Sequence, residues 1–177
     1  YTSIPRLNST LPNSSVVTFT GSLSRASGED VGTYAIDIGT LTNTNFDVTF
    51  VPANFEITKL PVTITPTASQ SKTYGEADPR LTYTASPAVG SPLSNGIVVS
   101  LTGSLSRTAG DEVGNYTIGL GTLTNANYSF TLSPETFEIT KKELNASASS
   151  VSKEYDGTTS MSGVRLCLTG LETGDVV

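Results

Sequence analysis

The sequence predicts an all-β protein made of tandem β-sandwich modules of the immunoglobulin-like kind, with β-grasp-like modules as the alternative. Three observations lead to this prediction. Apolar and polar residues alternate with a period of two, glycine- and asparagine-rich turns interrupt the alternation, and the whole pattern recurs with an offset of 82 residues. No window shows the 3.6-residue spacing of an amphipathic helix. Alternation alone does not give the strand order, so both module types stay open.

The repeat is visible in the letters themselves. The segment Thr20–Arg25 (TGSLSR) returns unchanged as Thr102–Arg107, and Phe55–Lys59 (FEITK) returns as Phe137–Lys141. A fixed period of this length marks an array of similar modules. We expect 1–59 to be the C-terminal part of one repeat, 60–141 to be a complete repeat, and 142–177 to be the N-terminal part of a further one. The chain then reads as a segment of a longer protein.

The first half of the complete repeat contains three alternating runs, each with one apolar and one polar face. The alternation predicts strands around Val62 and Ile64, around Leu81 and Tyr83, and from Val99 to Leu105. Gly103 interrupts the apolar row of the third run, as Gly21 does in the preceding copy. A glycine at such a position predicts a bulge or the close approach of another backbone.

The second half of the complete repeat contains three further apolar rows. The rows predict strands from Tyr116 to Leu120, from Tyr128 to Leu132, and around Phe137 and Ile139. Turn-forming residues separate them, and the substitutions between copies keep the character of each face. Phe46 becomes Tyr128, for example, so that size and polarity are retained where the core is expected.

Composition excludes several functional classes. The chain has a formal net charge of -6 and no histidine, which argues against nucleic-acid binding and removes both triad chemistry and the usual zinc sites. Its acidity and the absence of a long apolar run argue against membrane insertion. The single cysteine, Cys167, has no partner in the chain for a disulfide. We expect no enzymatic activity.

The junctions between repeats are short. Leu60 and Pro61 alone separate the end of one repeat from the first alternating run of the next, and the second junction, 141–144, is of similar length. Proline restricts the backbone, so this connection differs from a flexible glycine- and serine-rich tether. The spacing therefore predicts modules stacked end to end as a stiff stalk.

Three motifs together carry a family resemblance. They are the Lys-x-Tyr-Gly opening at Lys72, the Gly-acid-acid-Val-Gly-x-Tyr segment at Gly110, and the Phe-Glu-Ile-Thr-Lys close at Phe137. The combination resembles the MBG (YGX-type) repeats of bacterial surface and secreted adhesin-like proteins, and Tyr155-Asp-Gly resembles their YDG repeats. The resemblance implies an extracellular or cell-surface location and a structural or adhesive role.

Paired carboxylates are the first candidate site. Glu29 and Asp30, and their counterparts Asp111 and Glu112, lie in glycine-flanked turns. Grouped carboxylate and carbonyl oxygens suit Ca²⁺, although two acids fall short of its usual six to eight oxygen ligands. Calcium is the one cofactor that the sequence suggests, and a solvated turn is the simpler interpretation.

The most variable loop is the second candidate site. The loop from Ser86 to Gly96 differs most from its counterpart at Ser3 to Ser14, so a ligand site would involve Pro87, Pro92 and Asn95. Tyr74 and Tyr155 could stack on a sugar ring. The Ser-x-x-Lys motif at Ser69 matches serine acyl-enzymes, but no helix accompanies it.

We therefore expect a non-catalytic stalk or spacer whose partners are the neighbouring repeats of the same chain. The main alternative is an adhesive module that binds host or environmental glycans or surface proteins. A third hypothesis is self-assembly into filaments, in which the C-terminal strands of one molecule complete the N-terminal module of another.

Overall fold

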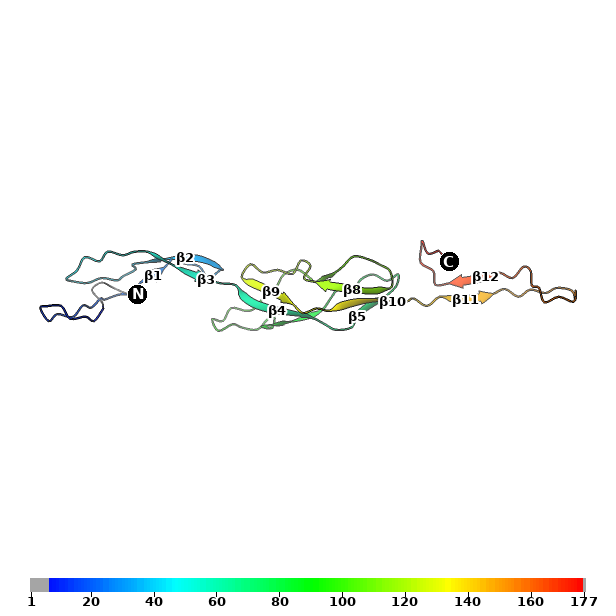
Figure 1. Ribbon diagram of the computed structural model, residues 1–177, viewed down its shortest axis with the longest axis horizontal. Coiled ribbons are helices and arrows are strands. Elements are labelled where there is room, and N and C mark those ends of the chain that lie inside the picture. Colours follow the sequence, from blue (N-terminus) through cyan, green and yellow to red (C-terminus); the bar gives the residue numbers. More distant parts are fainter. Residues whose placement is uncertain (1–6, 177) are drawn as a thin grey trace. The chain divides into compact units, whose positions relative to one another are not determined.

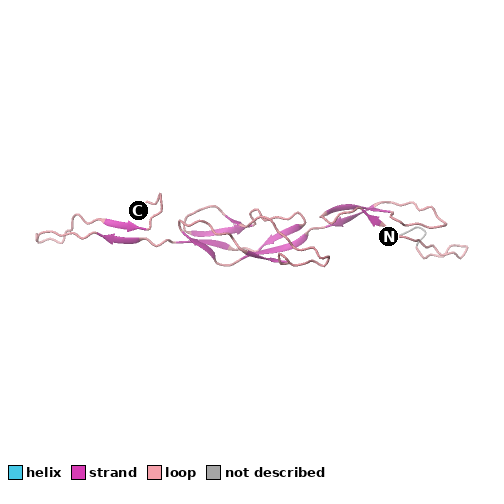
Figure 2. Ribbon diagram, turned by 180° about the vertical axis from the view of Figure 1, so that it is seen from behind, coloured by secondary structure: helices cyan, strands magenta, loops and turns pink. Residues whose placement is uncertain are grey.

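The computed structural model describes residues 7–176, and these residues form strands, turns and loops without a helix (Figure 2). The prediction of an all-β, β-sandwich-like repeat protein is confirmed. Within the described range, no helix is long and apolar enough to span a membrane. The chain divides into two compact units, which are 1–61 with 125–129, and 62–124 with 130–177.

The first unit contains one antiparallel sheet in the order β1-β2-β3. Its strands are β1 (Ser24–Arg25), β2 (Gly32–Asp37) and β3 (Ala53–Ile57). A bridge between Thr20 and Thr42 extends the pairing beyond β1. Among the described residues of this unit, Val17, Leu41 and Tyr128 are the buried apolar ones.

The second unit contains most of the complete repeat, which forms two sheets, and a separate strand pair (Figure 1). One sheet has the order β6-β4-β9 and the other has the order β5-β10-β8-β7. β11 and β12 form the separate pair. The strands are β4 (Leu60–Pro66), β5 (Gln70–Thr73), β6 (Tyr83–Ser86), β7 (Ser106–Arg107), β8 (Gly114–Gly119), β9 (Tyr128–Leu132), β10 (Thr136–Thr140), β11 (Asn145–Ala148) and β12 (Leu166–Thr169).

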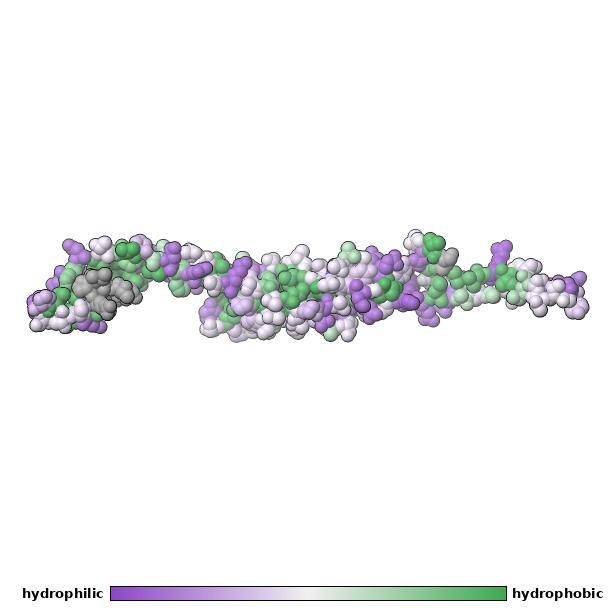
Figure 3. Space-filling view, in the orientation of Figure 1, coloured by the Kyte–Doolittle hydropathy of each residue, from purple (hydrophilic) through white to green (hydrophobic). Residues whose placement is uncertain are grey.

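The core of the complete repeat comes from the predicted apolar rows. β4 is buried at every second residue, which places Val62 and Ile64 inside. β8 and β10 of the other sheet contribute Ile118, Phe137 and Ile139, which are also fully buried. The outward residues of β8 and β10 are polar, and the face in Figure 3 mixes polar and apolar surface. The period-two alternation in the sequence therefore corresponds to alternate buried and exposed residues along the strands.

Two strands differ from the sequence prediction. The run from Val99 to Leu105 forms no strand, because Gly103 has a φ of 89° and leaves only an isolated bridge between Thr102 and Thr124. Conversely, β5 was not predicted, and it pairs in parallel with β10, placing Lys72 beside Ile139. The expected close approach at Gly103 is present, since a Cβ there would overlap the carbonyl oxygen of Thr122.

The two copies differ in how their last strand is covered. In the complete repeat β10 lies between β5 and β8, and Phe137 is 0 % exposed. Its counterpart β3 is an edge strand among the described residues, and Phe55 is 45 % exposed. β5 therefore completes the core on this side of a repeat. Self-assembly by strand addition concerns contacts between molecules and stays a prediction.

Substitution of Gly103 by alanine tests the close approach. Gly103→Ala should lower the free energy of unfolding by about 3 kcal/mol or more, because it adds both left-handed backbone strain and overlap with Thr122. Gly96→Ala is the matched control, since Gly96 has a φ of 83° and a Cβ added there would have no atom within 4 Å. We expect it to cost about 1–2 kcal/mol in the same chemical denaturation experiment. Equal losses would contradict the overlap.

Candidate functional site

An arginine organises the loop that follows β7. The Arg107 guanidinium lies over the rings of Tyr116 and Phe137, at 4.7 Å and 5.4 Å from their centroids. Its Nη1 donates hydrogen bonds to the carbonyl oxygens of Thr108 and Gly110. The Tyr116 hydroxyl donates to the carbonyl oxygen of Glu112 at 2.6 Å. One cation thus joins a strand end, two aromatic rings and a turn.

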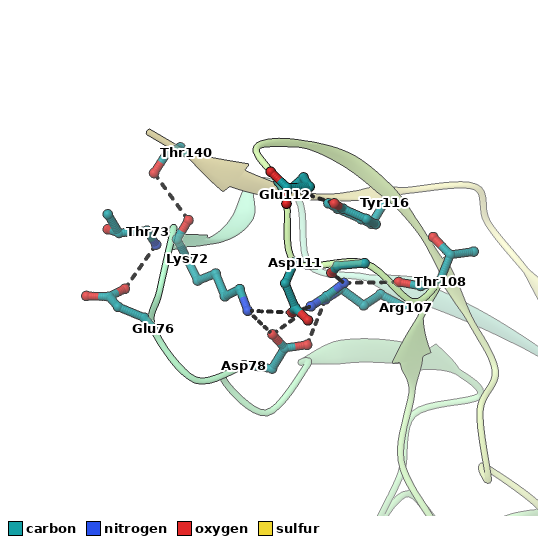
Figure 4. A network of polar contacts seen from close by, with 11 residues as sticks. Lys72, Thr73, Glu76, Asp78, Arg107, Thr108, Asp111, Glu112, Tyr116 and Thr140 are labelled. Carbon is teal, nitrogen blue, oxygen red and sulfur yellow. Dashed lines mark hydrogen bonds and ion pairs between the residues drawn. The ribbon is translucent and has the colours of Figure 1, made fainter. Parts of the chain in front are cut away.

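Two carboxylates neutralise this arginine and a buried lysine (Figure 4). Asp78 accepts from Arg107 Nε and Nη2 at 2.7 Å and 2.8 Å, and its Oδ1 lies 2.7 Å from Lys72 Nζ. Asp111 Oδ1 lies 3.4 Å from both cations. The side chains of Lys72 and Arg107 are 6 % and 8 % exposed. We call these four residues the ion cluster.

The ion cluster favours the charged forms of Asp78 and Lys72. The hydrogen bonds from Arg107, and then from Lys72, lower the pKa of Asp78 to about 2. The hydrogen bond to Asp78 raises the pKa of Lys72, against the opposing effect of desolvation. A proton donor or acceptor for catalysis needs a pKa near the working pH. An amide crosslink between Lys72 and Asp78 would need a neutral amine and a neutral acid, so the geometry supports ion pairing instead.

The same arrangement recurs in the first unit in a simpler form. Arg25 lies over the rings of Tyr34 and Phe55, at 5.1 Å and 5.2 Å, and donates to the carbonyl oxygens of Ala26 and Gly28. Glu29, in place of Asp111, accepts from Arg25 at 2.6 Å. The recurrence indicates that this arginine is part of the architecture of each repeat.

An open hollow of about 580 Å³ lies beside the ion cluster. Its lining comes from two segments, Asp78–Leu81 and Ser104–Asp111. Three of the charged groups at its wall, Arg107, Asp78 and Asp111, are paired with one another in the ion cluster. The exposed side chain of Arg80 also lines the hollow, together with Leu81 and Leu105.

A second kind of polar contact lies at the junction between repeats in the first unit. The Asn127 side chain accepts a hydrogen bond from the Val31 amide at 2.8 Å and donates one to Asp30 Oδ1 at 2.7 Å. Its backbone carbonyl accepts from the Leu60 amide at 3.0 Å. By sequence Asn127 belongs to the complete repeat, yet the turn around it is part of the first compact unit.

The second unit contains corresponding contacts after Lys141. The Tyr74 hydroxyl donates to Asp175 Oδ1 at 2.7 Å, and Asp175 Oδ2 accepts from the Glu172 amide at 2.9 Å. Lys142 pairs with Glu172. The hydrogen bond to Asp175 raises the pKa of Tyr74 to about 12, and the same bond lowers the pKa of Asp175.

The predicted calcium residues lie in four different settings. Glu29 pairs with Arg25, Asp111 belongs to the ion cluster, Asp30 contacts Asn127, and Glu112 offers its carbonyl to Tyr116. Across the described residues 7–176, no three acidic, cysteine or histidine side chains gather into a group that could hold a metal ion. Calcium binding stays a prediction.

The predicted ligand residues lie on one hairpin-like loop. Pro87 follows a cis peptide bond at the end of β6, Pro92 bridges to Val98, and the Asn95 side chain accepts from the Ile97 amide at 3.1 Å. The counterpart loop has the same backbone hydrogen bonds, with Leu11 and Ser14 in place of Leu93 and Gly96. The sequences differ while the backbone is kept. Ligand binding by these residues stays a prediction.

Sequence reasoning missed the ion cluster and the junction contacts. Arg107 lies 29 residues after Asp78 in the chain, and only the unchanged TGSLSR segment hinted at a fixed role for its arginine. In the Ser-x-x-Lys motif, Ser69 lies in the turn before β5 with a φ of 60°, and Lys72 lies on β5 and pairs with Asp78 and Asp111. Tyr74 serves the second junction, and Tyr155 is 98 % exposed.

These features define a repeat domain of the kind found in surface-associated proteins. A family model, the MBG domain (YGX type), matches residues 2–56 and 62–138. The chain belongs to this family, which is a structural, non-enzymatic domain type. The search of curated proteins and the search of solved structures both returned no match. The division into 1–59, 60–141 and 142–177, including the YDG segment, stays a prediction.

Acid titration tests the ion cluster. The folded-state pKa of Asp78 is about 2, below its unfolded value of 3.8, so its stabilising contribution is present above about pH 4. This contribution should be lost as the pH falls from 4 towards 2. Asp78→Asn should remove that part of the pH dependence and lower stability at pH 7 by about 1 kcal/mol or more, because two cations lose a partner. Urea unfolding measured between pH 2 and pH 7 checks this.

Asp47→Asn is the matched control, because Asp47 is an exposed aspartate outside the cluster. An acid dependence of the Asp78→Asn protein equal to that of the Asp47→Asn protein would contradict the assignment.

Proposed function

We propose that this chain is a non-catalytic stalk or spacer segment of an extracellular, adhesin-like bacterial surface protein. The observation that carries this proposal is that both short junctions are accompanied by polar contacts on either side. Asn127 contacts Asp30 and Val31 at the first junction, and Tyr74 contacts Asp175 at the second. A spacer needs connections that restrict bending, and a two-residue linker held by side-chain contacts supplies them.

The chemistry of the chain supports the same proposal. The two buried cations of the complete repeat, Lys72 and Arg107, are held in ion pairs, and many of its exposed residues are serine, threonine or acids. A net charge of -6 favours solubility and disfavours adhesion to anionic surfaces. These are properties of a module that separates other parts of a protein. Neighbouring repeats of the same chain are then its principal partners.

Distance distributions between spin labels test the stalk. With Cys167 replaced by serine, labels at Asp47 and Ser94 should give a narrow distance distribution by double electron–electron resonance. The control carries eight glycine and serine residues inserted after Lys59, which should broaden the distribution severalfold because the junction becomes a flexible tether. A native distribution as broad as that of the control would contradict the proposal.

A second candidate function is adhesion through the hairpin-like loop at 90–99. It is favoured by the finding that the two copies keep the same backbone hydrogen bonds there while their side chains change. Three apolar residues of this region, Val89, Ile97 and Val98, are about half exposed. A constant scaffold with variable side chains suits recognition of glycans or surface proteins.

Exchange of the two loops tests this candidate. Replacing residues 90–99 by the residues of 8–17 should leave the melting temperature within about 2 °C, because the hydrogen-bond pattern is shared. If the loop binds a glycan, a thermal-shift panel should show stabilisation of the native chain that the exchanged chain has lost. An equal shift in both proteins, or none in the native protein, would count against adhesion through this loop. Running the panel with and without Ca²⁺ also tests the predicted calcium turns.

A further inference from the structure

We infer that the acid-valine pair directly before β2 and before β8 in the two YGX-type repeats is a docking surface for the next repeat in the chain. The pair is Asp30-Val31 in the first copy and Glu112-Val113 in the second. The feature that it receives is a tight turn of the following repeat that presents an asparagine or aspartate side chain. This inference deepens the proposed stalk function by naming the surface and its partner.

The first copy shows the contact in full. Asn127 uses three groups towards this surface: its side-chain oxygen meets the Val31 amide, its side-chain amide meets Asp30, and its backbone carbonyl meets the Leu60 amide. An asparagine side chain offers one acceptor and one donor, which match a backbone N–H beside a carboxylate. Neither leucine nor lysine could make both bonds.

The turn that presents Asn127 is built locally. The Asn127 amide donates to Asn125 Oδ1 at 2.9 Å, and Asn45 donates in the same way to Asn43 at 2.7 Å. This is the Asx-type turn that asparagine favours. Because the corresponding turn of the first copy has the same shape, its presence is a property of the repeat and not a product of the junction.

The second copy uses the same region towards a different repeat. A hollow of about 310 Å³ is lined by Glu112, Val113 and the linker lysines on one side and by Gly170, Leu171 and Asp175 on the other. Tyr74 donates to Asp175, while Lys142 pairs with Glu172 in the same turn. Gly75 faces the Glu172 side chain here, and its φ of 86° lies in the left-handed region that favours glycine.

The side chain presented by the following repeat fits the hydrogen-bond donors and acceptors available at each junction. The first junction offers a backbone N–H and a carboxylate, and asparagine satisfies both. The second offers the Tyr74 hydroxyl and Lys142, which are donors only in this setting, and the turn presents Asp175 and Glu172. The same region of a repeat therefore accepts turns of two repeat types. In each case the side chain presented by the turn has the donors or acceptors that the neighbouring groups require.

Amide hydrogen exchange tests the first junction in the full chain. In Asn127→Ala the Val31 amide loses its acceptor, and its exchange rate should rise by about tenfold. The matched control is Asn45→Ala, which removes the equivalent asparagine of the first copy and should leave the Val31 amide unchanged. Equal exchange of Val31 in native and Asn127→Ala proteins would overturn the inference for this junction.

Tyrosine titration tests the second junction. In the native chain Tyr74 should titrate near pH 12, and in Asp175→Asn its pKa should fall towards 10, because the accepting charge is gone. Tyr74→Phe should remove the titration step near pH 12 and so assign it to Tyr74. Tyr155→Phe replaces the exposed tyrosine at the equivalent position and should leave that step unchanged. A Tyr74 pKa that does not respond to Asp175→Asn would overturn the inference for this junction.

The outcomes separate this inference from the stalk itself. Loss of the two junction signals together with a broader spin-label distribution supports docking as the source of stiffness. The docking surface is refuted if the Val31 exchange rate does not depend on Asn127, the Tyr74 pKa does not depend on Asp175, and the spin-label distance distribution stays narrow. The stalk would then be held by its short linkers alone. A broad distribution in the native chain would refute the stalk whatever the junction signals show.

Discussion

The complete repeat depends on the satisfaction of a single buried guanidinium. Arg107 is 8 % exposed in its side chain, and a buried cation is tolerated only when its charge and its donors are matched. The two aromatic rings take its faces, two turn carbonyls and Asp78 take its donors, and Asp78 in turn holds Lys72. Arginine fits this position because its planar fork can stack and form bidentate bonds at once. Lysine could not do both.

That constraint also shapes the loop that meets the next repeat. Gly110 has a φ of 143° and lies so close to the Tyr116 ring that a Cβ would overlap it, and Gly28 repeats this geometry against Tyr34. On its inner side the loop therefore packs against the arginine and the tyrosine ring. The acid and valine that follow are directed away from the arginine, where Asp30 and Val31 meet Asn127. One short motif thus serves both the interior of its own repeat and the attachment of the next.

The sequence allowed the fold class to be predicted because burial in a sheet leaves a period-two record. Val62, Ile64 and Phe137 were expected inside and are fully buried. β5 escaped prediction because its inward residue is Lys72, whose burial depends on Asp78 and Asp111 and not on hydrophobicity. The run from Val99 to Leu105 misled for the opposite reason, since its alternation is real but a left-handed glycine prevents ladder pairing. Both cases depend on contacts between distant parts of the chain.

The candidate sites were harder to predict than the fold for a related reason. Carboxylates next to each other in sequence were expected to act together, yet Asp111 turns towards Arg107 and Lys72 while Glu112 lines the junction hollow. The two residues lie in a bent loop before β8, where each has different contacts, so adjacency in sequence does not bring their carboxylates together. The internal comparison of copies held a signal that the prediction did not use, because the unchanged TGSLSR segment contains the arginine of the ion cluster.

The energetics of the junctions suit an array of independent modules. Each contact is a hydrogen bond or ion pair at a partly exposed site, worth about 1 kcal/mol, whereas each complete core buries several large apolar side chains. Coupling between neighbouring repeats is then small compared with the stability of one repeat. In such a chain the loss of one module need not unfold the next, as expected for nearest-neighbour coupling in repeat proteins. Weak contacts can nevertheless restrict a two-residue linker, because only a narrow range of linker conformations has to be selected.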